Sequence, residues 1–507
     1  MRRMSGTVID QFIPFLPVAV ALAGAGLVVA TRRRPNLREG CSLAAAVLQF
    51  LLVVGMIPPI LDGQTLHFTV LSFLPQVAIA FRVDALGLLF AITASFLWIL
   101  TTVYSIGYMR HLREHAQTRY YAFFALAMAA TVGIAFSANL VTLYIFYELL
   151  TFITYPLLTH SGSPAAYAAG KKYLMYQLGA SFLFLLPAII VTYTLSGTFD
   201  FQPNGVLPAA ANATVLVLVY GLFLAGAAKA AIMPFHSWLP AAMVAPTPVS
   251  ALLHAVAVVN AGVFLILRVI LDIFGQDLLR QLRLDVVTIV VVSVTILVAS
   301  FHALRLDSLK AVLAYSTISQ LSYMILGVVL LGPTAMIGGV IHLVNHAVAK
   351  ITLFFCAGSI DLATGRTKIS ELSGIGRQMP WTMAAFSIAA LSIVGIPPTA
   401  GFITKWFLAA GSIEADKLAV FFVLLTGTLL SAAYYLRIIR TAFFGSPARE
   451  GGEEATHQAA GGSPQEPERV REVSPLILAP LLVSAALSVI LGIYPGFFID
   501  LVQLALP

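Results

Sequence analysis

Charge and cysteine are both scarce in this chain of 507 residues. Only 10% of the residues are charged, compared with about 25% in soluble domains, which excludes an ordinary soluble enzyme. The two cysteines, Cys41 and Cys356, are too few to hold an iron–sulfur cluster by the usual four thiolates, and they provide no disulfide framework. The chain has neither a G-x-x-x-x-G-K phosphate loop nor a G-x-G-x-x-G turn after a strand. We therefore expect no cofactor, no metal and no redox catalysis by the chain itself, and the energy must come from an ion gradient or a partner subunit.

Long apolar runs dominate the sequence, of which 59% is hydrophobic. A helix that spans a bilayer needs about 20 apolar residues, so the runs predict an all-α polytopic membrane protein with about fourteen transmembrane helices. The predicted spans are 12–31, 42–61, 83–107, 120–137, 139–159, 172–196, 213–239, 248–270, 285–302, 310–331, 335–360, 382–410, 418–436 and 475–505.

The positions of the basic residues give this arrangement an orientation. Of the 29 Lys and Arg, 19 fall in the odd-numbered loops, 7 fall on the opposite side, and three, Lys229, Lys350 and Lys405, fall inside spans. The positive-inside rule then puts the odd loops in the cytoplasm and both termini outside it, in a cell (inner or plasma) membrane. Loop position also explains the net charge of +7 better than binding to nucleic acid does.

The segment 222–254 carries Lys229 near its middle and Pro234 directly afterwards. A charged side chain at bilayer depth costs at least about 2.5–3.5 kcal/mol on insertion scales, so it is kept only where a cavity or a partner receives it. Proline lacks a backbone N–H and its ring clashes with the preceding turn, which predicts a break near Ile232–Met233. A broken helix with a buried ionisable group is how many transporters build a midplane ion site. The alternative is a lysine near the end of a span that reaches the interface.

Glu148 is the only acidic residue predicted to lie deep within a span. A lone buried carboxylate would take up a proton, whereas a nearby ammonium would keep it ionised. Lys229 is the natural partner. The alternative is a protonated glutamate bonded to a hydroxyl or carbonyl of a neighbouring helix.

Two further spans carry titratable side chains. His254 lies about one turn inside span eight. Histidine titrates near neutral pH, which suits a proton carrier. The alternative is a histidine that only packs in the core, with its ring nitrogens hydrogen-bonded to neighbours. In span eleven, His342, His346 and Lys350 follow one another at intervals of four residues, about 6 Å apart on one helical face. These three groups predict a proton relay. A metal site is disfavoured because no third ligand lies nearby and Lys350 would repel a cation.

Span twelve repeats the pattern of span seven. Gly395, Pro397 and Pro398 interrupt its apolar run, and Lys405 follows the interruption. Two broken spans five positions apart predict an internal duplication whose copies, being five helices long, are inverted in the membrane.

This arrangement divides the chain into five parts. Residues 1–119 hold spans 1–3, with an outward hairpin within 62–82 and an expected ion pair between Arg82 and Asp84. The two five-helix repeats follow, and Gly-, Pro- and Glu-rich composition predicts a disordered cytoplasmic linker after them. The remaining boundaries are 120–271 (spans 4–8), 272–445 (spans 9–13), 446–474 (linker) and 475–507 (final span).

Several stretches resemble the antiporter-like subunits shared by Mrp-type cation/proton antiporters, respiratory complex I and membrane-bound hydrogenases. They are YELL around Glu148, AGAAKAAIMPFHSWLPAAMVAPTPVSALLH, DSLKAVLAYSTISQLSYM, HLVNHAVAKITLFFCAGSI and GIPPTAGFITKW. The resemblance covers residues from about 80 to 440, and Lys405 in place of a glutamate resembles the D-type subunit of Mrp antiporters. It implies a mid-membrane hydrophilic axis made of Glu148, Lys229, His254, Lys350 and Lys405, with His342 and His346 filling it.

Together these patterns predict a proton-translocating subunit of a multisubunit Mrp-type Na⁺(K⁺)/H⁺ antiporter or of a related complex I- or hydrogenase-type pump. The expected partners are other hydrophobic subunits, protons, Na⁺ or K⁺, and lipids. One alternative is a membrane subunit that couples the proton gradient to inorganic-carbon uptake. A purely structural scaffold would leave the ionisable groups at membrane depth unexplained.

Overall fold

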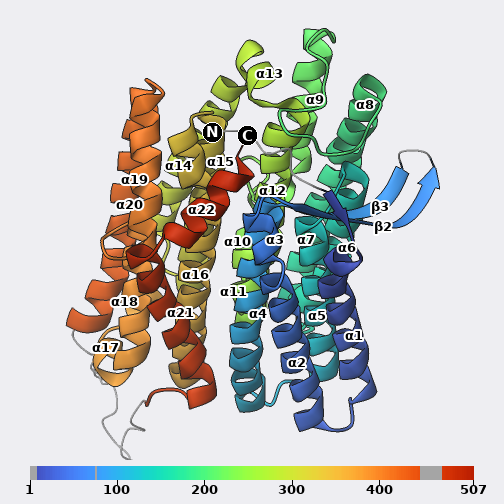
Figure 1. Cartoon of the computed structure of the whole chain (residues 1–507). Coiled ribbons are helices and arrows are strands. Elements are labelled where there is room, and N and C mark those ends of the chain that lie inside the picture. The colour runs from blue at the N-terminus through green and yellow to red at the C-terminus, as the bar shows by residue number, and fades with distance from the viewer. Residues whose placement is uncertain (1–7, 75–76, 446–470, 507) are drawn as a thin grey trace, which may run out of the picture.

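The computed structural model describes residues 8–74, 77–445 and 471–506. It is a bundle of helices that stand side by side, with one small β-sheet at its edge (Figure 1). Twelve helical stretches in the described residues are long and apolar enough to cross a membrane. The predicted class, an all-α polytopic membrane protein, is confirmed.

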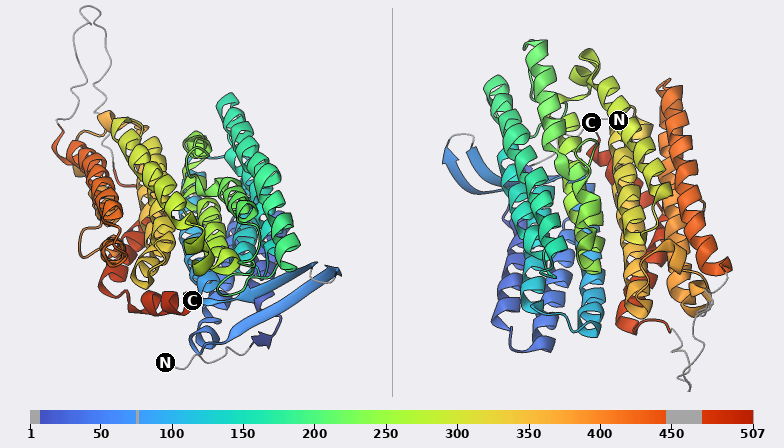
Figure 2. Two further views of the ribbon diagram at one scale, coloured as in Figure 1. Left: turned by 90° about the horizontal axis from the view of Figure 1, so that it is seen from above. Right: turned by 180° about the vertical axis from the view of Figure 1, so that it is seen from behind.

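The N-terminal half stands beside the C-terminal half (Figure 2). Its helices begin and end as follows: η1 (Ile13–Phe15), α1 (Leu16–Ala30), α2 (Pro35–Val54), α3 (Ile57–Leu61), α4 (Ala85–His111), α5 (Gln117–Ala135), α6 (Leu140–Leu158), α7 (Pro164–Ala180), η2 (Ser181–Leu185), α8 (Leu186–Ser196), α9 (Ala213–Gly226), η3 (Ala228–Ala230), α10 (Trp238–Ala241), η4 (Ala242–Val244), α11 (Thr247–Leu252), η5 (Leu253–Ala257), α12 (Val258–Arg268) and η6 (Val269–Phe274).

The C-terminal half contains the long central helix of the bundle and the second interrupted span. Its helices are α13 (Gln276–Gln281), α14 (Leu284–Arg305), α15 (Leu309–Val329), α16 (Pro333–Thr364), η7 (Ile369–Glu371), α17 (Ile375–Gln378), α18 (Pro380–Val394), α19 (Ala400–Glu414), α20 (Leu418–Phe444), α21 (Pro475–Ile493) and α22 (Gly496–Ala505).

The predicted outward loop contains a hairpin. Strand β2 (Thr65–Leu74) pairs antiparallel with β3 (Val77–Val83), and β1 (Val8–Asp10) adds to β2 in parallel. Phe81 of β3 is fully buried, and its ring lies 5.7 Å from that of Phe15 and 5.6 Å from that of Phe146 on α6. The hairpin is therefore anchored to the bundle by aromatic packing, while its far end projects from it (Figure 1).

Both spans that were predicted to be broken are interrupted. The second break falls where it was expected, between the end of α18 at Val394 and the start of α19 at Ala400. The first break was predicted near Ile232–Met233, but α9 already ends at Gly226. Lys229 therefore lies in the short 3₁₀ turn η3 inside the break, not in the helix before it.

The final span also differs from the prediction. Helix α21 ends at Ile493, and α22 begins at Gly496 as a separate, inclined helix that packs on α4 (Figure 1). Pro495 lies at the junction. Because proline has no backbone N–H to donate, it cannot continue the hydrogen-bond ladder of α21, and the helix ends before it. The segment is thus one long helix followed by a short one.

Helix α16 occupies the centre of the second half and is buried along most of its length, as is its neighbour α15. Gly327 of α15 and Gly339 of α16 face one another, and a Cβ atom on Gly327 would lie 2.5 Å from the Cα atom of Gly339. The absence of side chains at this point lets the two backbones approach closely. This approach brings polar side chains of α15 within reach of α16.

Residues 446–470 of the predicted linker lie outside the described residues. The division into two inverted repeats, the domain boundaries and the membrane orientation stay predictions.

Candidate functional site

Lys229 is fully buried and is held by one face of α6. Its Nζ atom donates a hydrogen bond of 2.6 Å to Oγ1 of Thr151 and lies 3.4 Å from the ring centre of Tyr147. The ring face is the negative end of the aromatic quadrupole, so it attracts an ammonium group. The side chain points into protein and not toward an interface, contrary to the alternative in which it reaches the lipid headgroups.

Neighbouring side chains satisfy backbone groups freed by the break at η3. The indole N–H of Trp238 donates to the carbonyl of Ala228 at 2.9 Å, and the N–H of Met233 donates to Oγ1 of Thr295 at 3.3 Å. Gly262 of α12 lets this turn approach, since a Cβ atom there would lie 2.1 Å from the backbone nitrogen of Ala230. Irregular backbone at membrane depth is tolerated when it is buried in protein in this way.

Glu148 does not form the direct ion pair with Lys229 that we expected. Both residues are described, and no Lys229 nitrogen lies within 4.0 Å of a Glu148 carboxylate oxygen. The carboxylate instead accepts a hydrogen bond from the hydroxyl of Ser181 in η2. Lys229 rests on the face of α6 formed by Tyr147 and Thr151, whereas the next residue along a helix points about 100° away. The hydrogen bond to a neighbouring hydroxyl matches that part of the alternative interpretation, whereas protonation of Glu148 stays a prediction.

The predicted row on α16 is buried as a unit. Nε2 of His342 lies 3.0 Å from Oε1 of Gln320 on α15, and the rings of His342 and His346 are 6.0 Å apart. Neither ring nitrogen of His346 has a hydrogen-bond partner among the described residues, although the side chain is fully buried. Buried polar atoms of folded proteins are nearly always paired, so His346 is an exception among the described residues.

Lys350, the last member of the row, is as fully buried as His346. Its Nζ donates to the carbonyl of Leu313 at 3.0 Å and to the hydroxyl of Tyr435 at 3.2 Å. The Tyr435 hydroxyl is in turn 3.0 Å from Oγ of Ser316, which also accepts from the hydroxyl of Tyr434. No carboxylate of the described chain lies within ion-pair distance of Lys350. Its hydrogen bonds within the described residues are therefore all to neutral oxygen atoms.

Lys405 lies on the second turn of α19, beyond the second break, and lines a cavity of about 210 Å³. Its Nζ donates to Oγ1 of Thr428 at 2.9 Å and lies 5.3 Å from the ring centre of Tyr323. The Tyr323 ring is 6.2 Å from that of His342. Lys405 is thus joined to the α16 row through one aromatic side chain.

An amide from α16 fixes the start of α19. The Nδ2 atom of Asn345 donates to the carbonyl of Ala400 at 2.8 Å and to Oγ1 of Thr404 at 2.7 Å. Asn345 therefore positions the helix that carries Lys405. No charge or motif in the sequence marks this asparagine as a site residue.

The site residues that are described form two groups. Glu148 and Lys229 lie together in the first half, whereas His342, His346, Lys350 and Lys405 lie together in the second. The backbone of His254 falls in η5, but its side chain lies outside the described part of the structure. Its expected place between the two groups stays a prediction.

A second charged cluster lies near the β-sheet. The expected pair of Arg82 and Asp84 is present at 3.1 Å, but Asp84 also pairs at 2.7 Å with Arg268, which in turn pairs at 2.8 Å with Asp272. Although burial alone would raise the pKa of the Asp84 carboxyl, the two guanidinium groups hold it well below its usual range. The cluster ties the start of α4 to the end of α12, and nothing in the local sequence around Arg268 predicted it.

Replacing Arg268 by alanine is expected to lower the free energy of unfolding by about 3 kcal/mol, since removing one partner from a buried ion pair costs about 3–5 kcal/mol. The low end applies because the Asp84 side chain is 23% exposed. Lys368→Ala is the control: its pair with Glu371 is exposed and worth about 0–1 kcal/mol. Denaturant unfolding of the purified proteins in detergent measures both. Equal losses for the two variants would show that the cluster is not a structural anchor.

The fold and the buried side chains define a polytopic membrane protein that retains lysine, histidine and glutamate inside its helix bundle. The chain belongs to the family described as NADH:quinone oxidoreductase/Mrp antiporter, TM, whose model matches residues 137–431. A second model, described as NADH-ubiquinone oxidoreductase (complex I), chain 5 N-terminus, matches residues 72–124. It is thus a membrane subunit of the antiporter and complex I kind, as the resemblance implied.

Individual relatives come from both branches of the family. The chain is 30% identical to NADH-quinone oxidoreductase subunit N of Desulforudis audaxviator, over 98% of each chain. It is 31% identical to the A/B-type subunit of a probable K⁺/H⁺ antiporter of Rhizobium meliloti, over 80% of this chain but 40% of that relative. A chain in the structure of the Mrp complex from Dietzia matches with a TM-score of 0.86 and 26% identity, over 97% of this chain and 96% of that one. The finer resemblance to the D-type Mrp subunit stays a prediction.

Proposed function

We propose that this chain carries protons across the membrane as one subunit of a multisubunit complex, either an Mrp-type Na⁺(K⁺)/H⁺ antiporter or a related respiratory pump. The observation that carries the proposal is Lys350, which is fully buried and bonded only to a carbonyl and a hydroxyl of the described chain. A cation at this depth is costly and is kept where an ion or proton passes. An amine without a counter-ion can both accept and release a proton.

The proposed path follows the polar side chains of the two groups. In the first group, Glu148 lies on the same turn of α6 as Tyr147, over whose ring Lys229 is placed. Two charges 4 Å apart interact by about 4 kcal/mol at an effective dielectric constant near 20. A rearrangement of α6 that brings the Glu148 carboxylate to Lys229 would hold the ammonium charged, and its withdrawal would release the proton.

The second group receives the proton. Spacing along α16 places His346 between His342 and Lys350, and the unpaired nitrogens of His346 suit a water-mediated hop. His254 is proposed to connect the two groups because η5 packs against α16. Lys405, beside its cavity, is the proposed end of the path.

The chain is proposed to act with other hydrophobic subunits in a cell membrane, with both termini outside the cytoplasm. The likeness to a chain of the Mrp complex of Dietzia supports the hydrophobic partner subunits. The named relatives are antiporter and quinone oxidoreductase subunits, and they do not favour the inorganic-carbon alternative.

Replacing Glu148 by glutamine should slow proton transport by the assembled complex roughly tenfold, since about 1.4 kcal/mol of lost interaction with Lys229 slows a step by that factor. Glutamine keeps the size of the side chain and a hydrogen bond to Ser181, but it cannot carry the charge. The measurement is the recovery of a pH-dye signal in inside-out vesicles after NaCl or KCl is added.

The matched control is Glu414→Gln, which neutralises an exposed glutamate at the end of α19. Recovery that depends on Na⁺ or K⁺ would identify an antiporter, whereas pumping driven only by an electron donor would identify a respiratory pump. Wild-type rates in Glu148→Gln, with the complex intact, would remove Glu148 from the path.

A further inference from the structure

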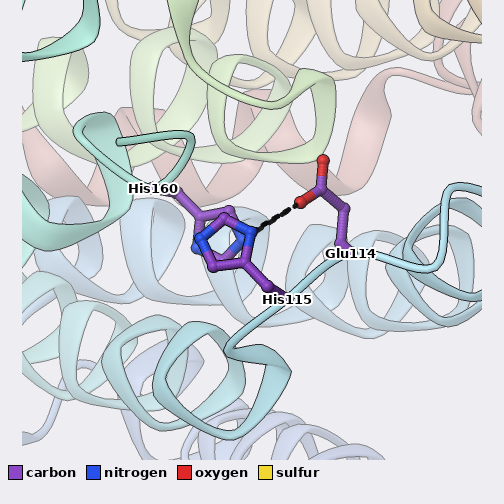
Figure 3. Close-up of side chains that lie close together, drawn as sticks. All are labelled: Glu114, His115 and His160. Carbon is purple, nitrogen blue, oxygen red and sulfur yellow. Dashed lines mark ion pairs between the residues drawn. The ribbon is translucent and has the colours of Figure 1, made fainter. Parts of the chain in front are cut away.

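Two histidines and a glutamate gather at the end of the bundle opposite the β-sheet. Glu114 and His115 lie in the connection between α4 and α5, and His160 follows the end of α6. One ligand atom from each residue lies within 4.8 Å of the other two. Figure 3 shows the two imidazole rings overlapping, with the Glu114 carboxylate beside them. These residues form no motif in the sequence because two separate connections contribute them.

His160 is the buried member of this cluster. Its side chain is fully buried, and neither of its ring nitrogens has a hydrogen-bond partner among the described residues. A buried imidazole whose ring nitrogens make no hydrogen bond within the described residues, and which lies beside a carboxylate, is suited to serve as a metal ligand.

The distances suit a small transition-metal ion. Oε2 of Glu114 lies 3.4 Å from Nδ1 of His115 and 3.7 Å from Nε2 of His160. Two ligand atoms that are each about 2.1 Å from a tetrahedral zinc ion lie about 3.4 Å apart. The His115 and His160 rings are stacked with centres 4.9 Å apart, so one must turn to aim its lone pair. The His115 side chain is 59% exposed and has the space to do so.

The chemistry of the ligand set selects the ion. Two imidazoles and one carboxylate, with water in the fourth position, form a known zinc set, whereas Ca²⁺ and Mg²⁺ require oxygen ligands. The guanidinium group of Arg119 donates to the His160 carbonyl at 3.4 Å, which brings a positive charge close to the proposed site. This charge repels a bound cation. Arg119 contacts the backbone and not the ligand atoms, so it weakens the site without blocking it.

We propose that Glu114, His115 and His160 bind one Zn²⁺ ion, which joins the α4–α5 connection to the end of α6. The ion would thereby restrain the helix that carries Glu148 and the residues that contact Lys229. This binding does not depend on the proposed transport function. It would hold for the isolated chain and for the assembled complex.

The test is calorimetric titration of the purified full-length protein, prepared without a polyhistidine tag, with ZnCl₂. One equivalent is expected to bind. Glu114→Gln, His115→Ala and His160→Ala should each weaken binding at least about tenfold, because even the loss of an outer-shell partner of a metal ligand costs 10–100-fold. The matched control is His111→Ala, which removes an exposed histidine one turn earlier and should leave the affinity unchanged.

Further measurements distinguish the loss of a metal site from the loss of the folded structure as the cause of weaker binding. Co²⁺ bound at the site should give the visible absorption of a four-coordinate ion, and Arg119→Gln should tighten zinc binding severalfold by removing a positive charge. Glu114 and His115 lie in a surface connection, so their variants are expected to fold and to elute as the wild type does. Unchanged zinc affinity in both of these folded variants, or zinc binding equally weakened by His111→Ala, would overturn the proposal.

Discussion

Transport by the assembled complex is expected to fall by about a hundredfold or more when Lys229 is replaced by alanine, because a positioned proton donor or acceptor typically contributes that much. Lys229 is fully buried, and its Nζ is bonded to Thr151 and placed over Tyr147. No other lysine or arginine of the described chain is bonded to this face of α6. The measurement is the cation- or donor-driven pH change in inside-out vesicles, normalised to the amount of assembled complex.

Two further variants separate a proton-carrying role from a structural one. Thr151→Val removes the hydroxyl that accepts from Lys229 but keeps the side-chain shape, so transport should fall less than in Lys229→Ala while assembly is unchanged. Lys171→Ala removes an exposed lysine on α7 and should have no effect. If Lys229→Ala assembled and transported at the wild-type rate, the first half of the path would be wrong.

The fold could largely be predicted because apolar length is a local signal. Every long apolar run became helical, although some of the runs, such as 213–239, 382–410 and 475–505, are divided between separate helices. Proline and glycine marked the second break at Gly395 and Pro397 correctly. The first break begins earlier than predicted, at Gly226, eight residues before Pro234. Gly226 packs against the backbone of Leu185, where a Cβ atom would lie 2.7 Å from the Leu185 nitrogen, and this tertiary contact has no signature in the sequence near Lys229.

Only the charged and titratable residues of the site could be predicted from the sequence. Lysine and histidine are conspicuous in apolar helices, so Lys350 and His346 were found from sequence alone. Their partners were not: Tyr435 lies 85 residues from Lys350, and a tyrosine, serine or threonine in a membrane helix is common without any role. The expected Glu148–Lys229 pair failed for a related reason, because the sequence does not say which face of α6 the break at η3 presents to Lys229.

Replacing Lys350 by methionine is expected to abolish transport, with a loss of about a hundredfold or more, and to leave the fold intact. Methionine is unbranched and apolar, so it can occupy the volume of the lysine chain without a buried charge. The groups that Lys350 contacts keep other partners: the Leu313 carbonyl still accepts from the Thr317 hydroxyl at 2.9 Å, and the Tyr435 hydroxyl remains 3.0 Å from Oγ of Ser316. The change therefore leaves neither of these two buried oxygen atoms without a hydrogen-bond partner. Thermal unfolding in detergent and the vesicle assay measure the two effects separately.

The companion variant is Tyr435→Phe, which removes one of the two acceptors of the Lys350 ammonium but leaves the amine in place. It should slow transport severalfold, and less than Lys350→Met does, because the proton carrier remains and only its orientation is lost. Thr441→Val is the control on the same helix: it removes a half-buried hydroxyl bonded only to its own helix at the Arg437 carbonyl, 2.9 Å away. Normal transport by a stable, assembled Lys350→Met protein would mean that protons do not pass along α16. A Tyr435→Phe loss as complete as that of Lys350→Met would instead place the essential group on the tyrosine hydroxyl.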